Sequence, residues 1–209
     1  MPGNRVGGHW RTIAVAVIAL SRTALAADSA ATATIRRLDE ALLGVLQQAN
    51  TLDYAGRYAR LTPAVTTAFD YAFMAEKSLG QHWKTLDAPQ RTRWLDLSLR
   101  FSIANYAANF DHWGGQTIDL LGEEPSANDT VVVHTRINDP KGETVEMNYR
   151  LRATDSGWKV VDIYLKGTVS ELALRRADYT AVMDRDGFDG LVRTMEGKIV
   201  ALAAGKAKR

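Results

Sequence analysis

Residues 142–167 read GETVEMNYRLRATDSGWKVVDIYLKG, and this stretch predicts two β-strands joined by a turn at residues 154–157. From Val145 to Leu151, apolar and polar side chains alternate, which is the period of a strand with one buried face. The second strand, residues 158–166, is apolar on both faces apart from Asp162 and the two lysines. We therefore expect it to lie inside a sheet or to line an apolar space.

The same reading extends to a four-stranded sheet flanked by helices. Helical spacing and capping residues predict helices over residues 27–50, 54–61, 70–80 and about 88–110, and a further helix that starts at Thr62-Pro63. A last helical segment begins at Thr168 and is interrupted at Gly187. The expected strands cover residues 116–123, 130–138, 143–154 and 158–166, and their short connections favour antiparallel neighbours. This order predicts an α+β fold in which helices pack on a curved sheet and enclose an apolar cavity, as in cystatin-like or nuclear-transport-factor-2-like cones.

The first 26 residues have the composition of a secretory signal peptide. Arg5 and Arg11 precede a short apolar run over residues 13–20, and residues 24–26 (ALA) match a cleavage site. The apolar run is shorter than the roughly 20 residues that span a bilayer. We expect residues 1–26 to be removed, residues 27–209 to form a single domain, and the protein to be exported to the periplasm.

The charge balance argues against a nucleic-acid partner. The chain has 26 Lys and Arg residues and 24 Asp and Glu residues, and losing Arg5, Arg11 and Arg22 with the leader leaves 23 basic against 24 acidic residues. A near-neutral chain lacks the basic surface that replaces counterions on nucleic acid. The absence of cysteine excludes disulfides, thiolate metal sites and cysteine nucleophiles.

Catalytic and metal-binding motifs are missing from the sequence. His82, His112 and His134 lack the spacing of a helical zinc motif, and phosphate-loop, dinucleotide and nucleophile-elbow patterns are absent. We expect no metal, no cofactor and no enzymatic activity. Asp162 leaves an alternative open: burial in an apolar strand would raise its pKa and suit a general base in a pocket enzyme of the ketosteroid-isomerase type. The favoured interpretation is structural pairing with Arg150 or a backbone amide.

Large apolar side chains are more numerous than two thin layers require. The helix over residues 88–110 carries two adjacent apolar stripes, so it is covered on most sides or faces both a core and a cavity. Methionine suits a pocket that accepts variable ligands. We infer that some of these side chains surround a ligand.

Five segments resemble a known family in their order along the chain: LGQHW (79–83), APQR (88–91), GWKVVD (157–162), KGTVS (166–170) and GFDGL (187–191). Together they resemble the MlaC-type, or toluene-tolerance, family of periplasmic lipid-binding proteins over about residues 35–202. The chain departs from the family pattern at Lys166 and Thr168, where an acidic residue and a smaller or apolar one are expected.

The resemblance implies a carrier that holds the acyl chains of a phospholipid and catalyses no reaction. Such a carrier moves lipid between an outer-membrane complex and an inner-membrane ABC transporter, which maintains outer-membrane lipid asymmetry. A related branch of the family is associated with hopanoid lipids. We expect a monomer that approaches membranes transiently. Strand faces, helix faces and family position together select ten lipid-contacting residues: Phe73, Met74, Trp94, Leu97, Phe101, Val145, Met147, Tyr149, Val161 and Ile163.

Two other functional classes remain compatible with the sequence. One is the pocket enzyme introduced above, acting on a small apolar substrate with Asp162 as general base. The other is a structural adaptor whose core is completely filled by its own side chains.

Overall fold

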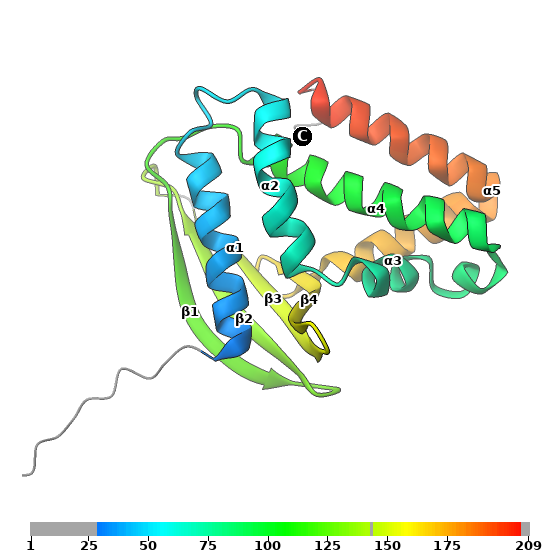
Figure 1. Ribbon diagram of the computed structural model, residues 1–209, viewed down its shortest axis with the longest axis horizontal. Helices are drawn as coiled ribbons and strands as arrows, with labels where there is room; N and C mark the ends of the chain where they lie inside the picture. The colour runs from blue at the N-terminus through cyan, green and yellow to red at the C-terminus, as the bar shows by residue number, and fades with distance from the viewer. Residues whose placement is uncertain (1–28, 143, 206–209) are drawn as a thin grey trace, which may run out of the picture.

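The computed structural model describes residues 29–142 and 144–205, so the predicted signal peptide lies outside the described residues. As predicted, the fold is α+β: an antiparallel sheet is covered by helices (Figure 1). In chain order, the elements are α1 (Ala30–Leu46), α2 (Tyr54–Ala68), α3 (Tyr71–Leu79), the short 3₁₀ helix η1 (Gly80–Thr85), α4 (Ala88–Asn109), β1 (Thr117–Ser126), β2 (Thr130–Asn138), β3 (Thr144–Thr154), β4 (Gly157–Leu165), β5 (Val169–Ser170) and α5 (Glu171–Ala203).

The sheet has the order β1-β2-β3-β4-β5, and each strand is antiparallel to the next. The four predicted strands are present, and the prediction of only four was incomplete. The fifth, β5, has two residues, too few for an alternation pattern to indicate it. Register shifts in β1 near Gly122 and in β4 at Val161 mark β-bulges. Bulges bend and twist the strands that contain them, which accounts for the predicted curvature of the sheet.

Two apolar cores hold the layers together. The larger core fills the space between the sheet and helices α1, α2 and α4, and it includes Ile35, Leu61 and Tyr149. The second core lies between α3, α4 and α5 and includes Trp94 and Met195, both fully buried. Figure 1 shows the resulting division: α1 lies over the sheet, while α3, α4 and α5 extend beyond its edge.

Several helix starts follow the predicted capping chemistry. Asp87 and Gln90 form both hydrogen bonds of a capping box at the start of α4, and the Asp70 carboxylate accepts the Phe73 N–H at the start of α3. The predicted cap Thr168 was wrong. Because β5 occupies residues 169–170, α5 begins later, and Ser170 accepts the Ala173 N–H at 3.0 Å.

Pro63 does not interrupt helix α2, whereas Gly187 interrupts helix α5. The predicted helix start at Thr62-Pro63 was wrong, because α2 runs continuously from Tyr54 to Ala68 with Pro63 in its interior. The Thr62 hydroxyl instead donates to the Tyr58 carbonyl at 2.8 Å. The predicted interruption at Gly187 is confirmed: the backbone there has φ 66° and ψ −172°, which kinks α5.

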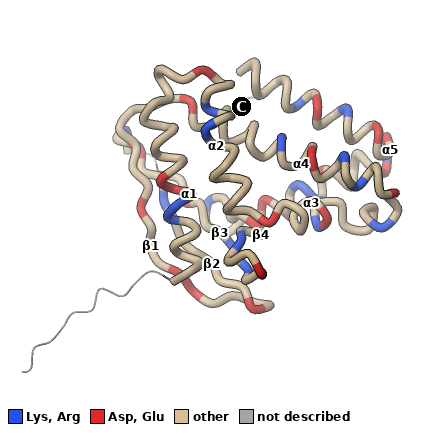
Figure 2. Tube along the Cα trace, in the orientation of Figure 1, with Lys and Arg blue, Asp and Glu red and all other residues tan. Residues whose placement is uncertain are grey.

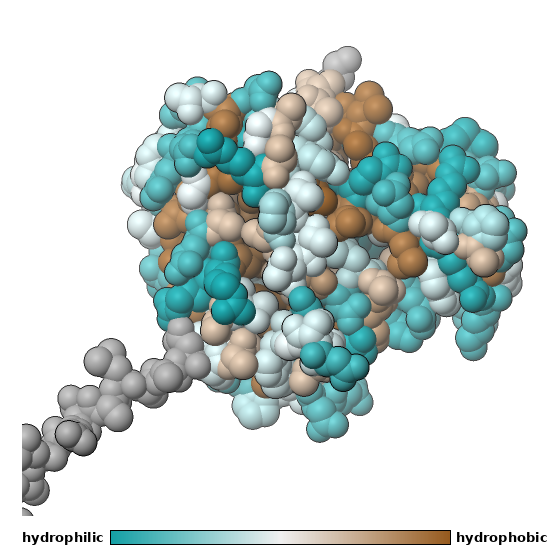
Figure 3. Space-filling view, in the orientation of Figure 1, coloured by the Kyte–Doolittle hydropathy of each residue, from teal (hydrophilic) through white to brown (hydrophobic). Residues whose placement is uncertain are grey.

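The molecular surface carries mixed charge and scattered apolar residues. Acidic and basic residues alternate along α4 and α5 (Figure 2). Most of the face seen in Figure 3 is hydrophilic or intermediate, with apolar residues gathered around α4 and the end of α5. Among the described residues, Val200 is the most exposed large apolar side chain, and it lies in that last segment.

Candidate functional site

A cavity of about 520 Å³ lies between the concave side of the sheet and the C-terminal half of α4. Cross-strand register explains its sheet wall: Met147 of β3 pairs with Leu165 of β4, and residues two positions along a strand share a face. Its apolar lining consists of Leu46, Phe69, Met74, Tyr106, Phe110, Ile137, Val145, Met147, Ile163 and Leu165. Its polar lining consists of Ser102, Asn105, Asn109, His112, Gln116, Asp139, Glu171 and Arg175.

One face of α4 supplies the opposite wall. Ser102, Asn105, Tyr106 and Asn109 follow the i, i+3, i+4, i+7 spacing that places side chains along one side of a helix. The Asn105 and Asn109 amides donate to the backbone carbonyls one turn earlier, at 3.1 and 2.8 Å. Their carboxamide oxygens stay available to accept hydrogen bonds, so this wall is polar without carrying charge.

A hydrogen-bonded loop closes one side of the cavity. Gln116 donates to the Asp139 carboxylate at 2.7 Å and accepts the Gly114 N–H at 2.7 Å, while Asp139 also accepts the Lys141 N–H at 2.8 Å. The backbone N–H of Lys141, followed by the Gln116 amide, lowers the pKa of the Asp139 carboxyl. Asp139 therefore stays ionised and fixes the loop after β2 against the loop after α4.

Two buried tyrosines, Tyr106 on the cavity wall and Tyr149 beneath it, keep their own hydroxyl groups uncharged. Burial raises the pKa of Tyr106 and Tyr149 well above the ordinary range for tyrosine, so both keep their hydroxyl protons. Tyr149 donates its hydroxyl proton to the Met147 sulfur at 2.9 Å. This contact holds the methionine side chain against the sheet wall.

Asp39 of α1 is a buried carboxyl in the core behind the cavity. It is 8% exposed, and within the described chain its Oδ2 atom has no hydrogen-bond partner. Burial raises the pKa of Asp39 to about 7, while Arg36 opposes the shift and Glu40 adds to it. A carboxyl with this pKa is largely protonated below neutral pH, which limits the charge placed in the core.

Four of the ten residues predicted to contact lipid lie on the cavity wall: Met74, Val145, Met147 and Ile163. The structure places Trp94 and Leu97 in the second core, fully buried, and Phe101 beside that core. Tyr149 is buried beneath the wall, and Val161 is the extra residue of the bulge in β4. Direct lipid contact by any of the ten stays a prediction.

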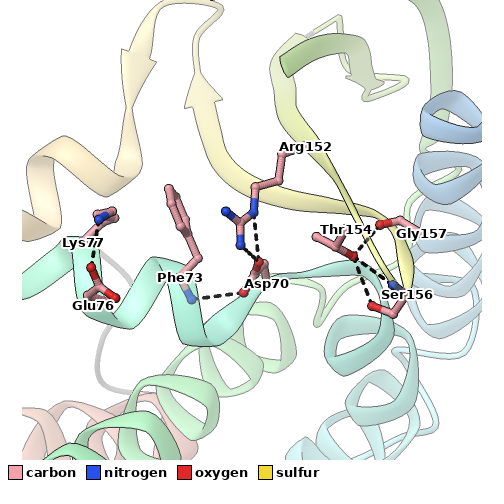
Figure 4. Close-up of polar contacts among 8 residues, drawn as sticks. All are labelled: Asp70, Phe73, Glu76, Lys77, Arg152, Thr154, Ser156 and Gly157. Carbon is pink, nitrogen blue, oxygen red and sulfur yellow. Dashed lines mark hydrogen bonds and ion pairs between the residues drawn. The ribbon is translucent and has the colours of Figure 1, made fainter. Parts of the chain in front are cut away.

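Phe73 lies at the start of α3 between two cations rather than on the cavity wall. The Arg152 guanidinium lies 4.4 Å from the centre of its ring and the Lys77 ammonium lies 5.4 Å from it. Arg152 also donates to the Asp70 carboxylate at 2.6 and 3.1 Å (Figure 4). These contacts fix α3 against β3 and give Phe73 a packing role.

The polar wall as a whole and part of the apolar wall were not predicted from the sequence. The apolar lining residues that were not predicted are Leu46, Phe69, Tyr106, Phe110, Ile137 and Leu165. The α4 residues carried a detectable signal, because Ser102, Asn105 and Asn109 interrupt two apolar stripes at helical spacing. Polar side chains on an otherwise buried helix face indicate a solvent-filled or ligand-filled space.

Asp162 forms structural hydrogen bonds. Its carboxylate accepts the backbone N–H groups of Ile163 and Leu172 at 2.9 and 3.1 Å and the Ser170 hydroxyl at 2.7 Å. Arg150 lies 3.7 Å away, as the structural interpretation predicted. Asp162 is 3% exposed and does not line the cavity.

The described part of the chain contains neither a candidate metal-binding cluster nor a helix suited to crossing a membrane. Within residues 29–142 and 144–205, no three His, Asp or Glu side chains gather into a group that could hold a metal ion. In the same residues, no helix combines the length and apolar character that a membrane crossing requires.

Comparison with known proteins identifies the family of this chain and solved structures with a similar fold. The family model described as MlaC protein matches residues 36–197. Among the similar solved structures is a phospholipid-binding protein from Ralstonia solanacearum, determined in complex with a phospholipid. It is 22% identical in sequence, the match covers 83% of this chain and 98% of that chain, and the TM-score is 0.72. The likeness shows that the two chains share a fold. No curated protein matches this chain.

Proposed function

Because the chain belongs to the MlaC family, we propose that it is a lipid carrier that binds the acyl chains of a phospholipid in the cavity between the sheet and α4. The observation that carries this proposal is the cavity itself. Its volume of about 520 Å³ falls within the range of about 300–1,000 Å³ typical of ligand pockets, and its lining is mainly apolar. The phospholipid bound by the Ralstonia protein of the same fold supports the choice of ligand.

Energetics favour a carrier that exchanges its cargo with another apolar environment. Each buried methylene contributes about 0.8 kcal/mol, so two acyl chains with ~30 methylenes would contribute roughly 24 kcal/mol relative to water. This exceeds the practical ceiling of about 18–21 kcal/mol for non-covalent affinity. Lipid would rarely leave such a site into water, whereas transfer to a membrane or to a partner protein is nearly neutral. No catalytic group is needed.

The cellular setting is part of the proposal. Residues 1–26 act as a signal peptide, and residues 27–209 form one lipid-binding domain in the periplasm. There the monomeric carrier moves phospholipid between an outer-membrane complex and an inner-membrane ABC transporter. A hopanoid is the alternative cargo, and mass analysis of the extracted lipid distinguishes it from a phospholipid.

A pair of equally exposed residues gives a matched test of the cavity. Val145 lines the cavity at 46% exposure, and Leu121 of β1 lies outside it at 49% exposure. A glutamate at either position can reach solvent, so both variants are expected to fold. Val145→Glu should lower the lipid that copurifies with the protein several-fold, because a carboxylate at the wall opposes acyl-chain binding.

The deeper substitution Met147→Glu should abolish lipid copurification, whereas Leu121→Glu should retain wild-type lipid content. Lipid is quantified by native mass spectrometry and extraction, and folding is checked by circular dichroism. Equal lipid content in wild type and in a folded Met147→Glu variant would place the lipid elsewhere.

A further inference from the structure

An ion pair forms part of the wall of this mainly apolar cavity. Glu171 and Arg175 lie one turn apart at the start of α5, and the Arg175 Nε–H donates to Glu171 Oε1 at 2.9 Å. Their side chains are only 24% and 19% exposed, and both line the cavity. Removing an ion pair from water is costly unless its hydrogen-bonding groups find partners. The pair therefore raises the question of which groups complete its hydrogen bonds when lipid excludes water.

Arg175 has more donors than its protein partners use. A guanidinium carries five N–H groups, and in the described chain only two have acceptors: Glu171 and the Ser102 hydroxyl, which accepts from Nη1 at 3.3 Å. The Arg175 Nη2 atom has no acceptor among the described residues, yet it is not among the fully buried side-chain nitrogens that lack a hydrogen-bond partner. The Phe101 ring lies 5.4 Å from the guanidinium carbon and supports the group on that side. The remaining donors are thus held in place and accessible.

The Glu171–Arg175 pair carries no net charge, so it favours an uncharged acceptor for the remaining Arg175 donors. Glu171 already balances the positive charge of Arg175, so a second anion such as a phosphate would leave one negative charge uncompensated in a poorly solvated site. An uncharged oxygen accepts the same hydrogen bonds without this penalty. The acyl chains of a phospholipid each begin at such an oxygen, the ester carbonyl.

We propose that Arg175 donates a hydrogen bond to an ester carbonyl oxygen of the lipid in the cavity and thereby selects ester-linked over ether-linked acyl chains. This inference rests on the proposed function. In the empty cavity, water occupies the same donors, and the carbonyl replaces that water when lipid enters. A dialkyl ether lipid of the same chain length and headgroup fills the apolar wall equally but lacks the carbonyl, and its ether oxygen offers Arg175 a weaker acceptor.

The test is a competition between two lipids that differ only in this linkage. The protein is incubated with vesicles containing equal amounts of diester and diether phosphatidylcholine of identical chain length, and the bound lipid is quantified by mass spectrometry. Because hydrogen bonds to charged groups are among the stronger ones, we expect wild type to prefer the ester lipid by about tenfold.

The variant that removes the pair as a unit is Glu171→Gln/Arg175→Met, which leaves no unpaired charge behind and should bind the two lipids equally. The control is Arg176→Met, an exposed neighbour outside the cavity, which should keep the wild-type preference. Equal binding of both lipids by wild type overturns the inference without any variant and leaves the proposed function standing. An ester preference that survives in the double variant also overturns it. Binding of neither lipid by wild type contradicts the proposed function itself.

Discussion

Removing the Asp162 carboxylate tests whether this residue stabilises the fold, because the structure gives it three hydrogen bonds and a nearby cation. It joins β4 to the start of α5 through the Leu172 N–H and the Ser170 hydroxyl. In Asp162→Ala, these buried donors lose their acceptor, and Arg150, 3.7 Å away, loses its partner. Breaking one side of a buried pair costs about 3–5 kcal/mol, so we expect the free energy of unfolding to fall by about 4 kcal/mol.

This loss is large enough to measure by two independent methods. For a chain of this size, each kcal/mol shifts the melting temperature by about 2–4 °C, so Asp162→Ala should melt roughly 10 °C or more below wild type. Urea unfolding should show a lower midpoint with an unchanged slope. Asp155→Ala, in the exposed turn between β3 and β4, is the control and should change stability by less than about 0.5 kcal/mol.

The same variant separates the structural role from the catalytic alternative. At a temperature where Asp162→Ala remains folded, it should bind as much lipid as wild type, because Asp162 does not line the cavity. A loss of stability below about 1 kcal/mol would refute the structural reasoning. A stable variant that had lost turnover of a small apolar substrate would favour the enzyme.

Three further substitutions test other parts of the fold. The folded chain holds the Asp39 proton up to about pH 7, whereas the unfolded chain releases it near pH 3.8, so stability falls as the pH rises through this window. The free energy of unfolding of Asp39→Asn, measured in urea titrations, should therefore rise relative to that of wild type by up to about 4 kcal/mol between pH 4 and pH 7. If the two proteins show parallel pH profiles, the raised pKa of Asp39 is contradicted. Gly187→Ala should cost about 1–3 kcal/mol by thermal melting, because a backbone with φ 66° and ψ −172° strains any residue that has a side chain. Steric crowding is not the cause, since nothing lies within 4 Å of the new Cβ. Gly197→Ala, in regular helix with equal space, is the control and should be neutral or stabilising. Asp70→Ala should cost about 2 kcal/mol by urea unfolding, because the cap on the Phe73 N–H and a charge-assisted pair are lost together, and a cost near zero would contradict that contribution.

Local chemistry in the sequence was sufficient for the fold class and most elements. The sequence alternation that predicts β3, the capping pair Asp87 and Gln90, and the break at Gly187 each depend on neighbouring residues only. The structure contains the strand, the capping box and the break. The predictions that failed depended on tertiary context. Pro63 was compatible with a helix start or a helix interior, and the start of α5 depended on a two-residue strand that forms only by pairing with β4.

The cavity residues were harder to predict than the fold, because periodicity identifies buried faces without distinguishing a filled core from a cavity. Trp94 and Leu97 share the apolar stripes of α4 with Tyr106, yet the first two pack against α5 and only Tyr106 reaches the cavity. Whether a residue of α4 is core or cavity wall depends on its position along the helix, because α4 leaves the second core and then passes over the sheet. That position is set by how α3, α4 and α5 pack together. Arg175 gave no local signal, since an i, i+4 pair with Glu171 also occurs on ordinary solvent-exposed helices.

The most direct test of the lipid-carrier account is native mass spectrometry of the protein purified from a bacterial periplasm, followed by extraction and identification of the bound lipid. The account predicts a protein that lacks residues 1–26 and carries a species of diacyl-phospholipid mass, which is lost in Met147→Glu and retained in Leu121→Glu. A protein that carries no lipid when purified, and that takes up none from vesicles, would contradict it.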